Sequence, residues 1–270
     1  VTQYREFCEV NAIRREWRAL ACAMQFLTRI PLATRTLFDN KDYANSLAWY
    51  PVIGLVLGGL VWLSGVALTE LSSASLAAAL LLAVWVLLTG ALHLDGVADC
   101  ADAWVGGFGD REKTFQILKD PRSGPIAVVM LVLVLLVKWA ALEVLLGSDQ
   151  WSIIWLIPLL ARGAMPYIFW RLDYASSSGL GSALVEGLSR QRILISLLFV
   201  TVAVTVALSM AMQLEILLLF VPVSLLIYLW WKHVSYQKLD GFNGDCAGAL
   251  VEFLELGLLL SLAIYAGYRL

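Results

Sequence analysis

Charged residues are scarce in this 270-residue chain: they make up 15% of it, against about 25% in an average soluble domain. Apolar residues make up 60%, and the mean hydropathy is +0.80. The formal net charge is only −2, so no basic excess points to nucleic acid and we expect no nucleic-acid partner. This composition argues against the alternative of a soluble all-helical protein with buried helices.

Several common sequence motifs are absent. The four cysteines (Cys8, Cys22, Cys100 and Cys246) form no CxxC pair, so we expect free thiols. Residues 1–18 carry charges of both signs without a continuous apolar core, so we expect no secretory signal peptide there. The sequence holds no tandem repeat and no GxxxxGK[ST] phosphate loop. We therefore predict one integral membrane domain over residues 1–270.

Long apolar runs are what the chain has in abundance, each about as long as the 20 residues that cross a hydrocarbon core. They predict an all-α polytopic membrane helix bundle with seven spans. Residues 1–46 form an N-terminal segment, in which residues 16–31 predict an amphipathic helix that lies on the membrane interface or packs on the bundle. The predicted spans are 47–68, 75–94, 125–147, 151–171, 193–212, 214–231 and 247–268.

Basic residues indicate the orientation. When successive connections between the predicted spans are assigned alternately to the two faces of the membrane, 16 of the 19 Lys and Arg residues fall on one face and only Arg269 falls on the other. Lys138 and Arg162 lie within spans. Because cytoplasmic loops are enriched in Lys and Arg, we expect the basic side, which includes segment 1–46, to face the cytoplasm.

The segment 92–124 concentrates charge between two apolar runs. Asp95, Asp99 and Asp102 are spaced i, i+4, i+7, which places them on one face of a helix. Carboxylates stacked in this way repel one another, so we expect a cation among them. Oxygen-only ligands favour Mg²⁺ over zinc or copper.

A second acidic segment, 240–255, lies on the same predicted membrane side. Asp245 and Glu252 share a face if a helix begins near residue 245, and we expect them to complete the metal site. Glu252 and Glu255 fall inside the apolar layer, where a carboxylate needs a wet cavity or a partner. Arg162 is the expected countercharge, either in a bundle-holding salt bridge or in a polar cavity. A helix cap is an alternative role for Asp95 or Asp245.

Basic side chains and glycines surround the acidic face. A site that combines carboxylates, Mg²⁺ and Lys or Arg side chains is typical of phosphoryl transfer, because the cations neutralise the charge on the phosphoryl oxygens. His93 is a candidate base for an attacking hydroxyl, with a structural role as the alternative. The candidate phosphate-binding residues are Arg29, Arg111, Lys119, Arg122 and Arg162.

These residues resemble the signature of the cobalamin synthase family, the adenosylcobinamide-GDP ribazoletransferases. The resemblance rests on LHLDGVADCADAWVGG and GDREKTFQILKDPRSGP at 92–125, with FLTRIP at 26–31, WYPVIGLVLGG at 49–59, SGLGS at 178–182 and DGFNGDCAGALVEFLE at 240–255. It covers nearly the whole chain in order. Pro121, Ser123 and Asn243 depart from the usual pattern and leave the acids intact.

The resemblance implies an enzyme of the bacterial inner membrane that joins adenosylcobinamide-GDP to α-ribazole, or its 5′-phosphate, and releases GMP. It implies Mg²⁺ as cofactor and an active site facing the cytoplasm, and the apolar outer surface permits a homo-oligomer in the lipid bilayer. We expect Asp95, Asp99 and His93 to be catalytic. The expected metal ligands are Asp95, Asp99, Asp102, Asp245 and Glu252.

Two other functions remain as alternatives. A CDP-alcohol phosphotransferase also places a DG motif at a membrane mouth, but Asp99 and Cys100 occupy the region where its arginine is required. A cation-coupled transporter would use Glu252, Glu255 and Arg162 as its pathway. Such a protein should carry charges in several spans and show inverted halves, and neither is evident.

Overall fold

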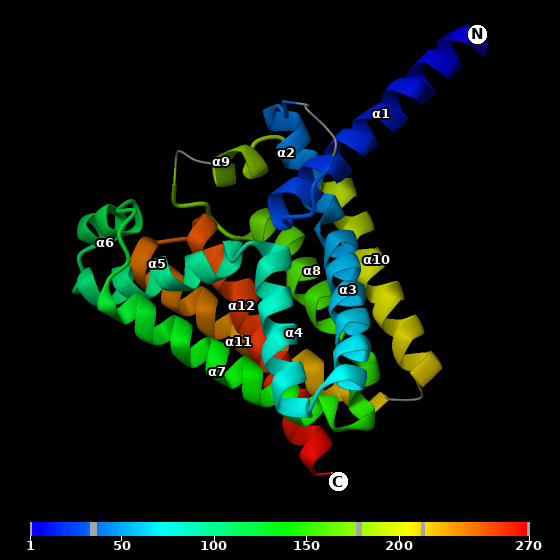
Figure 1. Ribbon diagram of the computed structural model, residues 1–270. Helices are drawn as coiled ribbons and strands as arrows, with labels where there is room; N and C mark the ends of the chain where they lie inside the picture. Colours follow the sequence, from blue (N-terminus) through cyan, green and yellow to red (C-terminus); the bar gives the residue numbers. More distant parts are fainter. Residues whose placement is uncertain (1, 33–36, 177–179, 212–213, 269–270) are drawn as a thin grey trace.

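The computed structural model describes residues 2–32, 37–176, 180–211 and 214–268, and these ranges fold almost entirely into helices (Figure 1). Within them, the one β-type pairing is an isolated bridge between Tyr174 and Phe242. The predicted all-α class is confirmed. The helices are α1 (Thr2–Leu27), α2 (Asn40–Ser46), α3 (Tyr50–Leu71), α4 (Ala74–Thr89), α5 (Leu92–Gly106), α6 (Arg111–Leu118), α7 (Pro125–Leu146), α8 (Leu156–Arg171), α9 (Leu180–Val185), α10 (Arg190–Ala211), α11 (Leu214–Leu239) and α12 (Gly244–Gly267).

Some of the predictions concern residues outside the described set. These are the first two residues of the SGLGS segment, residue 212 at the end of the fifth span, Arg269, and the side chain of Cys8. Cys22, Cys100 and Cys246 are buried free thiols, as predicted.

Six helical stretches in the described part of the chain are long and apolar enough to cross a membrane, and a seventh is counted if α4 and α5 form one broken span. The expected polytopic helix bundle is thus confirmed. Short 3₁₀ turns at Leu47–Trp49 and Asp149–Ile153 lengthen the first and third stretches. The six stretches are Asn40–Leu71, Pro125–Leu146, Asp149–Arg171, Arg190–Ala207, Glu215–Leu239 and Gly244–Gly267.

The prediction of a continuous span over 75–94 is wrong at its end. Helix α4 stops at Thr89, and α5 leaves it at an angle of 89°. The turn consists of Gly90 and Ala91, both in the left-handed region with φ of 62° and 58°. Glycine adopts this conformation without steric cost, so Gly90 is a favourable terminator. Helix α5 therefore runs across the end of α4 (Figure 1) and lies outside the six long spans.

Helix α1 bears on one of the two alternatives for the N-terminal amphipathic segment, its packing on the bundle. Its N-terminal half projects away from the bundle, whereas its C-terminal end lies against it (Figure 1). Ala19, Cys22 and Leu27 are buried, while Trp17 is 66% exposed. The helix ends at Leu27 rather than at residue 31, and the residue before Pro31 is biased away from helical backbone. The C-terminal end thus packs on the bundle.

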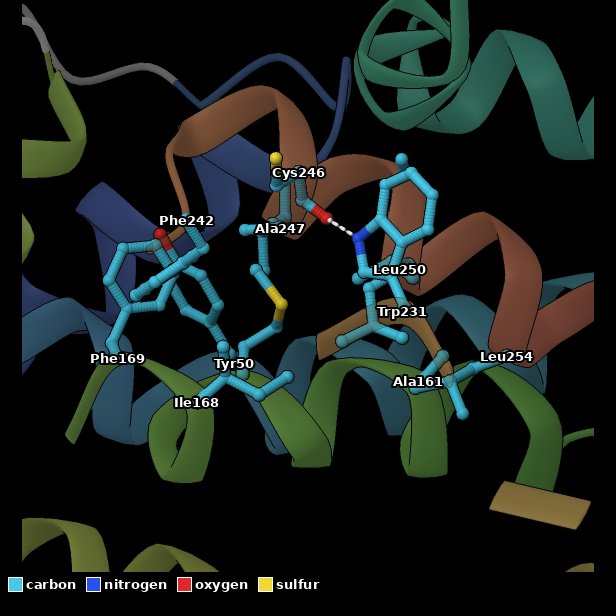
Figure 2. Packing of buried hydrophobic residues seen from close by; sticks show 14 of the residues in the cluster. Tyr50, Ala161, Ile168, Phe169, Trp231, Phe242, Cys246, Ala247, Leu250 and Leu254 are labelled. Carbon is cyan, nitrogen blue, oxygen red and sulfur yellow. Dashed lines mark hydrogen bonds between the residues drawn. The ribbon is translucent and has the colours of Figure 1, made fainter. Parts of the chain in front are cut away.

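Two buried apolar clusters fill the bundle. The first includes Tyr50, Phe169, Trp231 and Leu250, and Figure 2 shows its packing. The second includes Leu81, Leu142, Ile157 and Leu258 from α4, α7, α8 and α12. The outer faces of α7, α10 and α11 expose large apolar side chains, as lipid-facing helices do. Examples are Val128, Val132, Leu136, Leu194, Leu198, Val202, Leu218, Leu225 and Leu229.

Candidate active site

The two acidic segments meet because α5 and α12 pack with almost no side chain between their backbones. A Cβ at Gly96 would lie 2.5 Å from the carbonyl oxygen of Asp245, and one at Gly248 would lie 3.5 Å from the Cα of His93. Any side chain at Gly96 would push the neighbouring backbone away. The glycine of the first DG pair is therefore what allows the acidic face of α5 to reach the start of α12.

Three carboxylates gather at this contact. Asp95 is exposed, while Asp99 and Asp245 are partly buried. Partial burial and the negative charges of Asp95, Asp245 and Asp102 raise the pKa of Asp99 to about 7. Like charges held this close disfavour full ionisation, and a bound cation relieves that repulsion. The structure thus brings together three of the five predicted metal ligands.

Neither Asp95 nor Asp245 serves as an N-cap. The cap of α12 is Asn243, whose Oδ1 accepts a hydrogen bond of 2.9 Å from the backbone N–H of Cys246. Its Nδ2 donates to Asp245 Oδ2 at 2.8 Å, which orients that carboxylate. At α5 the cap position is Ala91, without a side-chain hydrogen bond. Sequence reasoning missed the role of Asn243, although an Asn directly before a helix is a recognised capping signal.

Asp102 is engaged elsewhere. Its Oδ1 accepts a hydrogen bond of 2.9 Å from the backbone N–H of Ala127, and its Oδ2 accepts one from Gly124. Both donors belong to the first turn of α7, where the free N–H groups and the helix dipole favour a negative charge. Asp102 shares the acidic face of α5, as predicted, and ties α5 to α7. Its role as a metal ligand stays a prediction.

Glu252 and Glu255 belong to a buried ion network rather than to the carboxylate group at the surface. Lys138 Nζ donates to Glu252 Oε2 at 2.5 Å and to Glu255 Oε2 at 2.6 Å. Arg162 Nη1 donates to Glu255 Oε1. These four side chains are at most 4% exposed, and their two positive and two negative charges balance. This geometry favours the salt-bridge reading of Arg162.

Lys138 was missed as a partner, although a lysine inside an apolar span signals a buried countercharge. The network lies where the two apolar clusters adjoin on three helices. Lys138 falls between Val134 and Ala141 on α7, and the Glu252–Glu255 turn precedes Leu258 on α12. Glu252 therefore lies deep in the bundle, and its role as a metal ligand stays a prediction.

His93 adjoins this network through Arg162 and also lines the cavity described below. Arg162 Nη2 lies 3.3 Å from His93 Nδ1. Because a guanidinium group only donates, Nδ1 accepts, and the ring proton of the neutral imidazole is on Nε2. The basic nitrogen therefore faces Arg162, and this geometry suits hydrogen-bond donation better than proton abstraction. Catalysis by His93 stays a prediction.

A cavity of about 400 Å³ opens beside the carboxylates. Its polar lining includes His93, Asp95, Lys119, Asn243 and Asp245. The rest of the wall is apolar and aromatic, contributed by α1, α3, α6, α8 and α12. Cavities of about 300–1,000 Å³ that combine apolar walls with a few convergent polar groups are typical ligand sites. The apolar and aromatic lining includes Phe26, Leu27, Tyr50, Phe115, Met165, Phe169 and Tyr174.

Of the five predicted phosphate-binding residues, only Lys119 lines the cavity. Arg111 pairs with Asp240, and Arg122 pairs with Asp120 at 2.7 Å, both on the exposed surface. Arg29 lies against Gly90 at the carboxyl end of α4, where its charge complements the helix dipole. Arg162 is fully buried in the ion network.

The donor set at the cavity mouth fits Mg²⁺ better than a softer metal, because it consists of carboxylate oxygens. Among the described residues, no group of three or more His, Cys, Asp and Glu side chains is placed to enclose a metal. Mg²⁺ in phosphate-transfer sites commonly uses one or two carboxylates together with substrate phosphates. One or two carboxylates from the set Asp95, Asp99 and Asp245 would be enough for a site of this kind.

Comparison with known proteins agrees with the family resemblance noted in the sequence. The family model described as "Cobalamin-5-phosphate synthase" matches residues 19–263. A relative from Pseudomonas entomophila (strain L48), named adenosylcobinamide-GDP ribazoletransferase, is 49% identical over 244 residues, covering 90% of this chain and 97% of that protein. Relatives of the same name from Pseudomonas fluorescens (strain Pf0-1) and Stutzerimonas stutzeri (strain A1501) are 45% and 44% identical, covering 90% and 92% of this chain and 98% of each relative.

No solved structure matches this chain significantly. The family match nevertheless extends from the C-terminal half of α1 nearly to the end of α12, and it includes both acidic segments and the cavity between them. The resemblance noted in the sequence is confirmed, and the chain belongs to the cobalamin-5-phosphate synthase family.

Proposed function

We propose that this chain catalyses the reaction for which its relatives are named. It joins adenosylcobinamide-GDP to α-ribazole, or to α-ribazole 5′-phosphate, and releases GMP in the final assembly of adenosylcobalamin. The observation that carries the proposal is the meeting of Asp95, Asp99 and Asp245 beside an aromatic cavity in a membrane bundle, with Asp95 and Asp245 in the cavity lining.

In this reaction a ribose hydroxyl that is free in both acceptors, and is therefore not the 5′-hydroxyl, forms a bond from its oxygen to the phosphorus attached to cobinamide. The bond from that phosphorus to the bridging oxygen breaks, and GMP leaves with the bridging oxygen. The proton of that ribose hydroxyl passes to a carboxylate of the cluster. Asp95 and Asp99, the carboxylates predicted to be catalytic, are the candidate acceptors.

Asp95, Asp99 and Asp245 would hold Mg²⁺, with Asp102 and Glu252 as further ligands on the prediction from the sequence. When bound, the metal supplies positive charge that stabilises the diphosphate oxygens and the departing phosphate. Lys119 lines the same cavity and would contact the diphosphate. Arg111 and Arg122 lie on the neighbouring exposed segment and would hold the GMP group as it leaves.

The distribution of basic residues supports a place in the bacterial inner membrane with the active site facing the cytoplasm. The exposed apolar faces of α7, α10 and α11 would contact lipid or a second copy of the chain.

The test is release of GMP from adenosylcobinamide-GDP by the purified protein in detergent or nanodiscs. We expect release that requires α-ribazole, stops on chelation of divalent metal and returns with Mg²⁺. Replacing α-ribazole with an alcohol acceptor and adenosylcobinamide-GDP with a CDP-alcohol tests the phosphotransferase alternative. Activity only with the CDP-alcohol would overturn the proposal.

A further inference from the structure

A second hollow of about 350 Å³ is formed by α8, α10 and α11, with Leu254 of α12 at its base. Of the described side chains that line this groove, only those of Tyr167, Ser224 and Tyr228 carry a polar atom. It shares no lining residue with the cavity beside the carboxylates. The groove is therefore a separate site of strongly apolar character.

The groove opens at the lateral surface of the bundle. Ile168 and Leu254 are at most 3% exposed and form its floor, whereas Val221 and Leu225 are 56% and 52% exposed and form its rim. The rim residues lie on the same face of α11 as the exposed Leu218, because they follow it at spacings of three and four residues. Since this face of α11 meets the lipid, a membrane lipid reaches the groove directly.

The length of the groove corresponds to one leaflet. At a rise of about 1.5 Å per residue, its lining on α8 from Leu156 to Ile168 spans about 18 Å, and that on α11 from Leu217 to Tyr228 spans about 16 Å. One leaflet contributes half of a hydrocarbon core that is about 30 Å thick. An acyl chain of that leaflet therefore extends along most of the groove.

Aromatic rings mark the end of the groove nearer the basic membrane face. Tyr167 and Tyr228 both line it, with ring centroids 6.0 Å apart, and Trp170 packs edge-on against Tyr167 at 6.5 Å. Tyrosine and tryptophan are enriched at the membrane–water interface. This end of the groove thus lies at the level where an acyl chain joins its headgroup.

Three cations lie at this aromatic end. Arg171 and Arg190 lie over the ring of Trp170, at 5.4 and 5.8 Å from its centroid. Lys232 follows Tyr228 by four residues, so it lies on the same face of α11. All three cations are exposed, and in the described part of the chain none of them takes part in a salt bridge.

One carboxylate adjoins this cluster in the sequence. Asp173 follows Arg171 by two residues, and its Oδ2 accepts a hydrogen bond of 3.1 Å from the hydroxyl of Tyr236. Three cations and one carboxylate leave a net positive charge beside the apolar groove.

We propose that the groove binds one anionic phospholipid, with an acyl chain along α8 and α11 and the phosphate among Arg171, Arg190 and Lys232. Each Lys or Arg close to an anionic lipid headgroup adds attraction, whereas a zwitterionic lipid has the same chains without the net charge. The charge of the headgroup therefore decides which lipid is retained. This inference goes beyond the proposed reaction and does not depend on it.

The first test compares headgroups on the wild-type protein. Purified protein in detergent is titrated with phosphatidylglycerol and with phosphatidylcholine of identical acyl chains, and retained lipid is counted by native mass spectrometry. We expect one phosphatidylglycerol to bind about tenfold more tightly than phosphatidylcholine. Equal affinity would overturn the inference. So would displacement of the lipid by an equal concentration of glycerol phosphate, because the site would then bind a free anion without the chain.

Charge variants assign the headgroup contacts. The double variant Arg171→Gln and Lys232→Gln should weaken binding of phosphatidylglycerol about tenfold and leave binding of phosphatidylcholine unchanged. The matched control, Arg14→Gln with Lys41→Gln, removes two exposed cations of the same predicted membrane face and should keep the wild-type preference. Equal losses in the two double variants would show that only the overall charge matters, which would overturn the assignment.

A second pair of variants assigns the acyl chain. Ser224→Phe places a large side chain in the groove and should weaken binding of both lipids at least tenfold. Thr201→Phe makes a comparable change at an exposed position of α10 outside the groove and should bind both lipids as the wild type does. Normal lipid binding by Ser224→Phe would place the chain elsewhere. A wild-type dimer that persists in phosphatidylglycerol and is lost in Ser224→Phe would assign the groove to a second copy of the chain and overturn the inference.

Discussion

The backbone of Gly96 on α5 is in contact with that of Asp245 on α12, so that a single added methyl group would lie 2.5 Å from the Asp245 carbonyl oxygen. This contact sets how closely the two acidic segments approach. The aspartates on either side of it, Asp95 and Asp99 on α5 and Asp245 on α12, belong to different parts of the sequence and act on one another electrostatically.

Gly96→Ala should therefore separate α5 from α12. Overpacking of this kind costs about 1–3 kcal/mol of stability, and displacement of the carboxylates should reduce kcat at least tenfold. Thermal unfolding in detergent and GMP release measure the two effects. Gly59→Ala is the matched control, because a Cβ at Gly59 has no neighbour within 4 Å and alanine favours the helix. Normal turnover by Gly96→Ala would show that the backbone contact does not position the site.

Asp99→Asn should abolish turnover but stabilise the metal-free protein. The folded-state pKa of Asp99 is raised to about 7 from its ordinary value of 3.8, so the folded state favours the protonated form. The stability from this preference is complete below about pH 4 and is lost as the pH rises through 7. In chelator, the stabilisation by Asp99→Asn should thus be larger at pH 8 than at pH 5. Melting temperatures at both pH values test this, and a variant less stable than wild type at pH 8 would contradict it.

Asp102 offers a way to tell a structural carboxylate from a metal ligand. Asp102→Ala removes the acceptor for the first turn of α7 and should cost about 1–2 kcal/mol. Asp102→Asn keeps an acceptor at that position and should restore most of the stability. If Asp102→Asn also restores GMP release, Asp102 acts through α7. If it is stable but needs a higher Mg²⁺ concentration to release GMP, Asp102 is a metal ligand as the sequence predicted.

In the buried ion network, the contributions of Lys138 and Glu252 to the free energy of unfolding should be strongly coupled. Lys138→Met leaves Glu252 and Glu255 with one countercharge, and removing one partner of a buried ion pair costs about 3–5 kcal/mol. Adding Glu252→Gln removes the excess negative charge and should recover much of that loss. Unfolding of the two single variants and the double variant gives the coupling energy. Additive losses would show that Lys138 and Glu252 stabilise the fold independently.

The sequence determined the class of this protein and most of its spans, because an apolar run of membrane length has few other structures open to it. It also determined that Asp95, Asp99 and Asp102 share a helical face, since that follows from spacing alone. The family followed from long motifs that resemble its signature and occur in the same order along the chain, and the comparisons confirmed it.

The direction of α5 and the partners of the charged side chains depend on how the helices pack against one another. The break after Thr89 turns α5 across the bundle, a direction that local hydrophobicity does not encode. Asp102 faces the N–H groups of α7, and Lys138 rather than Arg162 pairs with Glu252, because partners far apart in the chain compete for each charge. Spacing along one helix fixes which side chains share a face, whereas the packing of other helices fixes what that face meets.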